Sequence, residues 1–268
     1  MDLVHARVAL RERPLLDVVD LSIRFCVANA GAYARLSAAV LVPGLLASFA
    51  IARLGGWALG WMAAVVLSAL VDAPFVALAS RLVFSERTRV REVLRATAAA
   101  TPRLLVARLG QLFAFAVCLL AMGLPWLWLG SLLLFVPEVI VLEQSRPRSA
   151  WARASRIANA QLGIVMAANI VLSTLFVAGP IVADIAGREL LGTVLEIRPP
   201  RGVFAEGGSA LALLGFWCLV PLRATARFFF YLDVRTRTEG WDIQTRFAAL
   251  AAREASEAEA RATPARAA

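Results

Sequence analysis

Lysine is absent from this 268-residue chain, and histidine occurs only once. The single histidine, His5, and the three cysteines are too few for a zinc site, a histidine-based catalytic triad or a disulfide framework. Glycine-rich phosphate loops, carboxylate metal motifs and cofactor fingerprints are missing as well. We therefore predict that the protein is not an enzyme and that it uses no cofactor and no metal.

Apolar side chains, in contrast, are abundant. They make up 60% of the chain, and the mean hydropathy of +0.72 is far above that of a water-soluble domain. A helix that crosses a bilayer needs roughly 20 mostly apolar residues, because about 30 Å of hydrocarbon is crossed at 1.5 Å per residue. Six runs meet this requirement: Leu36 to Leu54, Trp57 to Ala79, Leu105 to Leu124, Trp126 to Leu142, Leu162 to Ala186 and Ser209 to Tyr231. The sequence predicts an all-α fold, a polytopic membrane bundle of six transmembrane helices.

The third and fourth runs follow each other closely. The stretch from Leu104 to Leu142 is too long for one crossing, and Gly123-Leu124-Pro125 in its middle is typical of a tight turn. The alternative is one long tilted helix, which would place Arg108 and Glu143 on opposite sides of the membrane. We therefore expect two helices joined by a short hairpin turn.

The arginines indicate the orientation of the six helices. All 28 basic residues are arginines, and with the N-terminus inside, 24 of them fall on inner segments. Because basic residues of short loops stay on the cytoplasmic side, both termini are expected in the cytoplasm. The first residues lack an apolar core and a small-residue cleavage site, so we expect no signal peptide to be removed. Only four arginines would lie outside: Arg53, Arg188, Arg198 and Arg201.

The net charge of +9 would favour nucleic acid as the partner of a soluble protein. Here the membrane topology already explains the arginines, and no aromatic residues are interleaved with them for base stacking. We therefore expect no nucleic acid partner and take membrane lipids as the default partner. The candidate contacts to lipid headgroups are Arg89, Arg91, Arg95, Arg103, Arg153 and Arg156.

The inner segments are amphipathic rather than plain linkers. Pro14 to Leu36, Arg89 to Arg108 and Ser149 to Gln161 each place apolar residues at helical spacing among arginines, which is typical of a helix lying in the headgroup region. Each segment precedes two membrane helices. The chain therefore divides into three similar units, residues 14–80, 86–145 and 147–231.

Two parts of the chain are expected outside the bundle. Residues 232–254 form a cytoplasmic juxtamembrane segment with a last helix, Ile243 to Glu254, that Asp242 caps, and residues 255–268 form a disordered tail. On the outer side, the loop from Gly187 to Gly208 is expected to be irregular, with one short helix at Glu189 to Leu195.

The second membrane helix of each unit has an ionisable residue beside a proline. These three helices run from outside to inside, so the three residues are expected in the cytoplasmic third of the membrane. An ionisable group there is costly and normally faces a partner or the interior of the bundle. These residues could form an internal charge cluster that serves a substrate or proton path. The alternatives are a structural ion pair, or side chains that reach nearby cytoplasmic water. The candidate intramembrane polar cluster is Asp72 (with Pro74), Glu138 (with Pro137) and Arg223 (with Pro221).

Three stretches together show a family resemblance: PLLDVVDLSIRF, VPEVIVLEQSRPRSAWARASRIANAQLGIV and RFFFYLDVRTRTEGWDIQTRF. They resemble bacterial six-helix membrane proteins akin to the membrane domain that is fused to some glycerophosphodiester phosphodiesterases. The resemblance implies a bacterial plasma (inner) membrane protein with both ends in the cytoplasm. Because the chain lacks the catalytic domain of the fused members, phosphodiester hydrolysis is not transferred and no site residue is carried over.

Two functions are compatible with these features. The first is a non-enzymatic accessory or scaffolding component whose cytoplasmic face meets lipid and a protein partner. The second is a small transporter or lipid-handling protein that uses the polar groups in helices two, four and six. A cavity that reaches Asp72 or Glu138 would favour the second function, and a sealed bundle would favour the first.

Overall fold

The computed structural model describes residues 13–84, 89–120 and 123–239. These residues form helices connected by short turns and contain no strand. The expected helix from Ile243 to Glu254 and the expected tail lie outside them. The all-α class and the six predicted spans are confirmed. Six segments are long and apolar enough to cross a membrane: Ala30–Gly55, Trp57–Phe84, Val90–Leu120, Leu124–Glu143, Leu162–Val194 and Ala210–Thr238.

The first unit consists of α1 (Leu15–Ala28), α2 (Ala30–Gly55) and α3 (Trp57–Phe84). The single amphipathic helix expected from Pro14 to Leu36 is divided at Asn29, whose side-chain amide donates a hydrogen bond of 2.9 Å to the Phe25 carbonyl. The same carbonyl also accepts the Asn29 backbone N–H at 3.1 Å, so the side chain adds a second bond at the end of α1. Gly56, with a φ of +88°, then allows α3 to turn back along α2.

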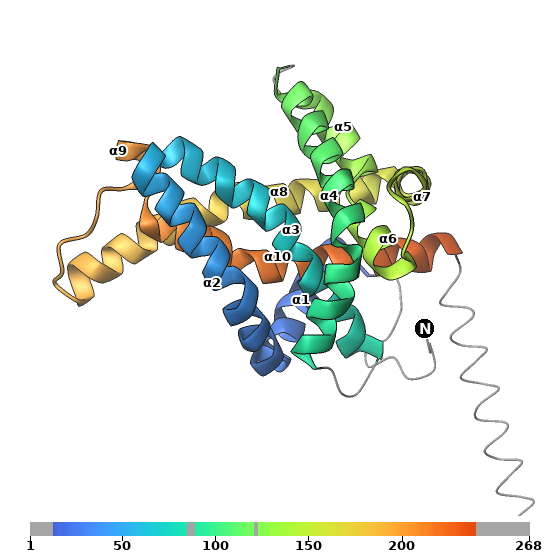
Figure 1. Cartoon of the computed structure of the whole chain (residues 1–268), viewed down its shortest axis with the longest axis horizontal. Helices are drawn as coiled ribbons and strands as arrows, with labels where there is room; N and C mark the ends of the chain where they lie inside the picture. The colour runs from blue at the N-terminus through green and yellow to red at the C-terminus, as the bar shows by residue number, and fades with distance from the viewer. Residues whose placement is uncertain (1–12, 85–88, 121–122, 240–268) are drawn as a thin grey trace, which may run out of the picture.

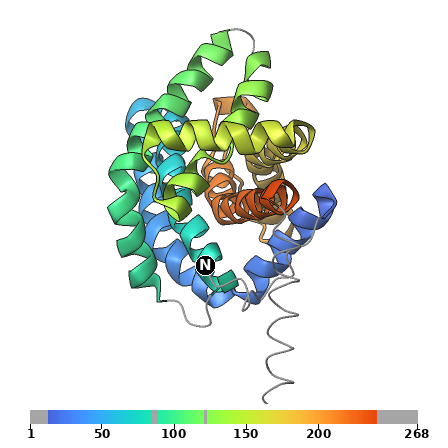
Figure 2. The same cartoon turned by 90° about the vertical axis from the view of Figure 1, so that its right-hand side faces the viewer.

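Helix α10 (Ala210–Glu239) occupies the centre of the molecule, and α8 (Leu162–Glu189) lies along it. Figures 1 and 2 show α1, α3 and α8 on different sides of α10. Large apolar side chains of α10, including Trp217 and Phe228, are fully buried. Helix α10 is not apolar on every side, because it also carries Arg223 and Arg227, and Leu214 near its start is 45% exposed.

Helix α4 (Val90–Leu120) and α5 (Leu124–Leu132) form the predicted hairpin, which projects away from the long axis of α10 (Figure 1). Gly123 has a left-handed φ of +75°, and Pro125 stands in the first turn of α5, which confirms the predicted turn. The separate helix expected from Arg89 to Arg108 is wrong, because α4 runs through this segment without interruption. The intervening residues are mostly alanines and other helix formers, and Pro102 is accommodated inside the helix.

The fourth span, expected from Trp126 to Leu142, is confirmed, but it is not one continuous helix. The chain breaks at residues 133–135, between α5 and α6 (Val136–Glu143). Pro137 explains the break, because it has no N–H to donate to the Leu133 carbonyl four residues earlier. This carbonyl instead accepts hydrogen bonds from the Val136 N–H at 3.2 Å and from Gln111 Nε2 at 2.7 Å.

The remaining elements close the two ends of the bundle. Helix α7 (Pro147–Ala160) packs against α6, and Trp151 on it lies against Gly110 of α4. At the opposite end, α8 continues as a π-helical turn, η2 (Leu190–Val194), which coincides closely with the short helix expected there. Helix α9 (Val203–Glu206) follows, and the buried Asp184 carboxylate accepts a bond of 2.9 Å from the Val203 N–H.

Candidate functional site

Two of the three predicted polar residues meet in the interior, where Arg227 joins them. Arg227 Nε donates to Glu138 Oε1 at 2.6 Å, and Arg227 Nη1 donates to Asp72 Oδ2 at 2.8 Å. Both carboxylate side chains are 0% exposed, and the Arg227 side chain is 6% exposed. Helices α3, α6 and α10 are therefore connected by one buried guanidinium group.

Arg108 of α4 is the second cation beside Asp72. Its Nη2 donates to the same oxygen, Asp72 Oδ2, at 2.5 Å, and its Nη1 donates to Gln111 Oε1 at 2.9 Å. Because Gln111 also donates to the Leu133 carbonyl, the arginine is connected through one amide to the break between α5 and α6. We call Asp72, Arg108, Glu138 and Arg227 the paired cluster.

Arg223, the third predicted residue, is not part of the paired cluster. It lies one helical turn before Arg227 on α10, and its guanidinium carbon is 4.7 Å from the centre of the Phe176 ring. Within the described part of the chain, Arg223 forms no hydrogen bond and no ion pair. Its only close partner there is the π-face of an aromatic ring, which is a weaker partner for a cation than a carboxylate.

The sequence reasoning missed the roles of Arg108 and Arg227. A usable signal was present, because both arginines lie inside predicted apolar runs, where a charged side chain requires a partner. The predicted topology already accounted for both arginines as residues of the inner side. Their place inside the apolar runs therefore received no interpretation of its own.

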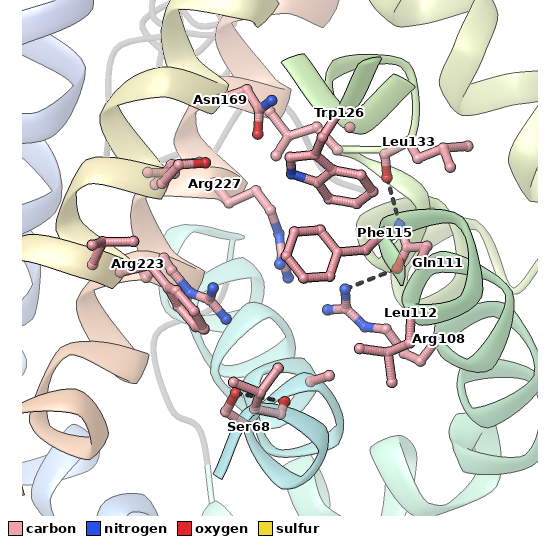
Figure 3. Close-up of a pocket in the computed structure, with 18 residues that line it drawn as sticks. Ser68, Arg108, Gln111, Leu112, Phe115, Trp126, Leu133, Asn169, Arg223 and Arg227 are labelled. Carbon is pink, nitrogen blue, oxygen red and sulfur yellow. Dashed lines mark hydrogen bonds between the residues drawn. The ribbon is translucent and has the colours of Figure 1, made fainter. Parts of the chain in front are cut away.

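A cavity of about 330 Å³ lies beside the paired cluster, enclosed by α3, α4, α5, α8 and α10. Figure 3 shows the guanidinium groups of Arg108, Arg223 and Arg227 directed toward this common space. Gln111 and Asn169 add amide groups to the same region of the wall. Among the described residues that line the cavity, none is acidic.

The charges around the cavity do not balance. Three arginines stand against the two carboxylates of Asp72 and Glu138, which lie behind the cavity wall, so the group carries a formal charge of +1. Arg227 Nη2 is buried and has no hydrogen-bond partner in the described structure, and the same holds for Asp72 Oδ1 and Glu138 Oε2. What the arrangement offers to a ligand in the cavity is therefore its excess positive charge.

The described residues contain no group of three or more histidine, cysteine or acidic side chains that could hold a metal ion. The chemistry that this site offers is therefore that of guanidinium and amide donors. These groups recognise oxyanions such as phosphate and carboxylate.

The arginines predicted to contact lipid headgroups separate into two kinds. Arg103 donates to the Gln144 carbonyl at 2.6 Å, and Arg153 lies 3.4 Å from the Glu143 carboxylate. These two side chains hold the ends of neighbouring helices together. The other four are exposed: Arg89, Arg91, Arg95 and Arg156.

No family model, curated protein or solved structure matched the chain. The resemblance to the membrane domain of glycerophosphodiester phosphodiesterases therefore stays a prediction.

Proposed function

We propose that this protein binds an anionic ligand within the membrane, in the cavity lined by Arg108, Arg223 and Arg227. The observation that carries the proposal is the cavity wall itself, which presents three guanidinium groups and no acidic side chain. This role belongs to the second class considered from the sequence, a lipid-handling protein or small transporter.

Arg223 is the one arginine of the cavity wall without a carboxylate partner among the described residues. An arginine at the centre of a membrane helix costs about 2.5–3.5 kcal/mol on insertion scales, and somewhat less toward the interface. Carboxylates of other helices compensate Arg227 and Arg108, whereas Arg223 faces the cavity with an aromatic ring as its neighbour. An oxyanion placed in the cavity would supply the charge that the protein does not supply.

We also propose that the protein lies in a bacterial inner membrane. The distribution of arginines favours a bacterial inner membrane with both ends of the chain in the cytoplasm. In this orientation, the paired cluster and Arg223 lie in the cytoplasmic third of the bilayer. The cavity reaches Arg108 and Arg227, the partners of Asp72, but neither Asp72 nor Glu138 itself lines it. The accessory or scaffolding role stays a prediction.

The test is a titration of the purified protein with octyl phosphate in an uncharged detergent, followed by isothermal calorimetry. We expect saturable binding to the wild type and a roughly ten- to hundredfold weaker affinity for Arg223→Gln. This range corresponds to the loss of one charge-assisted hydrogen bond of about 1.5–3 kcal/mol.

The matched control is Arg156→Gln, which removes the same charge from an exposed position on α7. Its affinity should equal that of the wild type. Equal losses in both variants would indicate attraction by overall charge and would refute binding in the cavity.

A further inference from the structure

The wall of the cavity changes from polar to aromatic side chains along the membrane axis. Arg108 and Gln111 on α4 lie closer to the cytoplasmic side than Phe115, and on α8 the amide of Asn169 lies closer to that side than Phe176. About 10 Å of helix separates Arg108 from Phe115 on α4, at 1.5 Å per residue. The cavity therefore has a cationic inner part that reaches as far as Arg223, which lies over Phe176, and an apolar end beyond it toward the middle of the bilayer.

The apolar end borders the lipid-facing surface. Phe115 on α4 is 39% exposed and Val177 on α8 is 62% exposed, and both residues line the cavity. In a membrane span, an exposed apolar side chain faces acyl chains. A ligand can thus reach the cavity sideways from the bilayer, past Phe115 and Val177.

The size of the cavity limits what it can hold. A volume of about 330 Å³ is at the lower end of the range of small-molecule pockets, about 300–1,000 Å³. This is enough for a phosphate group and several carbon atoms, but not for a complete lipid with its acyl chains. The chains of a lipid would have to extend through the apolar mouth.

Resting on the proposed function, we infer that the ligand is an acyl lipid with a small phosphate headgroup, taken from the cytoplasmic leaflet. Its phosphate accepts hydrogen bonds from the three arginines, and its chains pass Phe115 and Val177 toward the middle of the bilayer. This orientation is that of a lipid in the cytoplasmic leaflet. The lipid therefore enters by lateral movement and does not have to be inverted.

The first experiment separates a lipid from free phosphate. The protein in uncharged detergent is mixed in turn with dioleoyl phosphatidic acid, dioleoylglycerol and inorganic phosphate, and bound species are counted by native mass spectrometry. We expect one phosphatidic acid per protein, at least tenfold more retention than of dioleoylglycerol, and no displacement by equimolar inorganic phosphate. Arg223→Gln should lower the retention about tenfold, whereas Arg156→Gln should not change it.

The second experiment tests the orientation of the lipid. Phosphatidic acid with a diazirine at the middle of one acyl chain is photolysed with the protein in vesicles of phosphatidylcholine. We expect labelled peptides that contain Phe115, Trp126 or Val177, and the labelling should disappear in Arg223→Gln.

The outcomes distinguish the two proposals. If octyl phosphate and inorganic phosphate bind while phosphatidic acid is not retained, the lipid inference is overturned and the anion site stands. If no anion binds, the proposed function fails as well. Labelling that is the same in the wild type and in Arg223→Gln overturns the proposed entry and orientation.

Discussion

Arg227 and Arg223 lie one turn apart on α10, and yet their surroundings are opposite. Arg227 is held by two buried carboxylates that belong to α3 and α6. Arg223 faces the cavity and lies over the ring of Phe176. The two arginines have the same chemistry and nearly the same depth. Their roles differ because other helices bring partners to one of them and leave the other beside an open space.

The comparison distinguishes residues that stabilise the fold from a residue that binds a ligand. In the paired cluster, loss of one member leaves an uncompensated charge in a place that water cannot reach easily, so the free energy of unfolding decreases. At Arg223, loss of the side chain removes charge from a cavity, so the affinity for the ligand decreases. Substitutions in the paired cluster should therefore lower stability most, and a substitution of Arg223 should lower it least.

Arg227→Met should cause the largest loss, because it leaves Asp72 and Glu138 buried without their common partner. We expect the free energy of unfolding in detergent to fall by about 3–5 kcal/mol. The measurement is denaturant unfolding followed by circular dichroism, with Arg156→Met as the control at an exposed position. Similar losses in the two variants would contradict the structural role of the paired cluster.

Asp72→Asn should be less damaging than Arg227→Met. It removes the charge that faces Arg108 and Arg227, but the amide oxygen still accepts one hydrogen bond and Arg227 keeps Glu138. We expect a loss of about 1.5–3 kcal/mol in the same unfolding measurement. The double variant Asp72→Asn with Arg227→Met should lose less than the sum of the two single losses, since the residues are in direct contact. Additive losses would show that the pair is not coupled.

Gln111→Met should have an intermediate effect. The substitution keeps the length of the side chain and removes both of its hydrogen bonds, to Arg108 and to the Leu133 carbonyl. We expect a loss of about 1–3 kcal/mol. Hydrogen exchange should rise at residues 133–136, where the broken helix loses its second donor. Unchanged exchange at these residues would mean that Gln111 does not support the break.

Arg223→Gln should have the smallest effect on stability. It removes a contact with Phe176 that is worth about 0.5–1 kcal/mol. The affinity for octyl phosphate should nevertheless fall roughly ten- to hundredfold in this variant, whereas thermal unfolding should remain close to that of the wild type. A large loss of stability would place Arg223 with the paired cluster and remove the distinction on which the proposed function rests.

Several features of the fold could be predicted because they depend on neighbouring residues. The length of the apolar runs determined the six spans, and Gly123 with Pro125 determined the hairpin turn. The break before α6 is also a local effect, because Pro137 cannot donate a backbone hydrogen bond to Leu133. It was missed because the apolar run from Trp126 to Leu142 continues through it.

The sequence by itself determined which ionisable residues would lie inside the membrane, since each is placed by its position in an apolar run. Only the tertiary structure decided which of them would meet. Asp72, Glu138 and Arg227 come from three different helices, and their pairing depends on how these helices pack and rotate against one another. The cavity beside Arg223 depends in the same way on the angle of the α4–α5 hairpin, which no local pattern specifies.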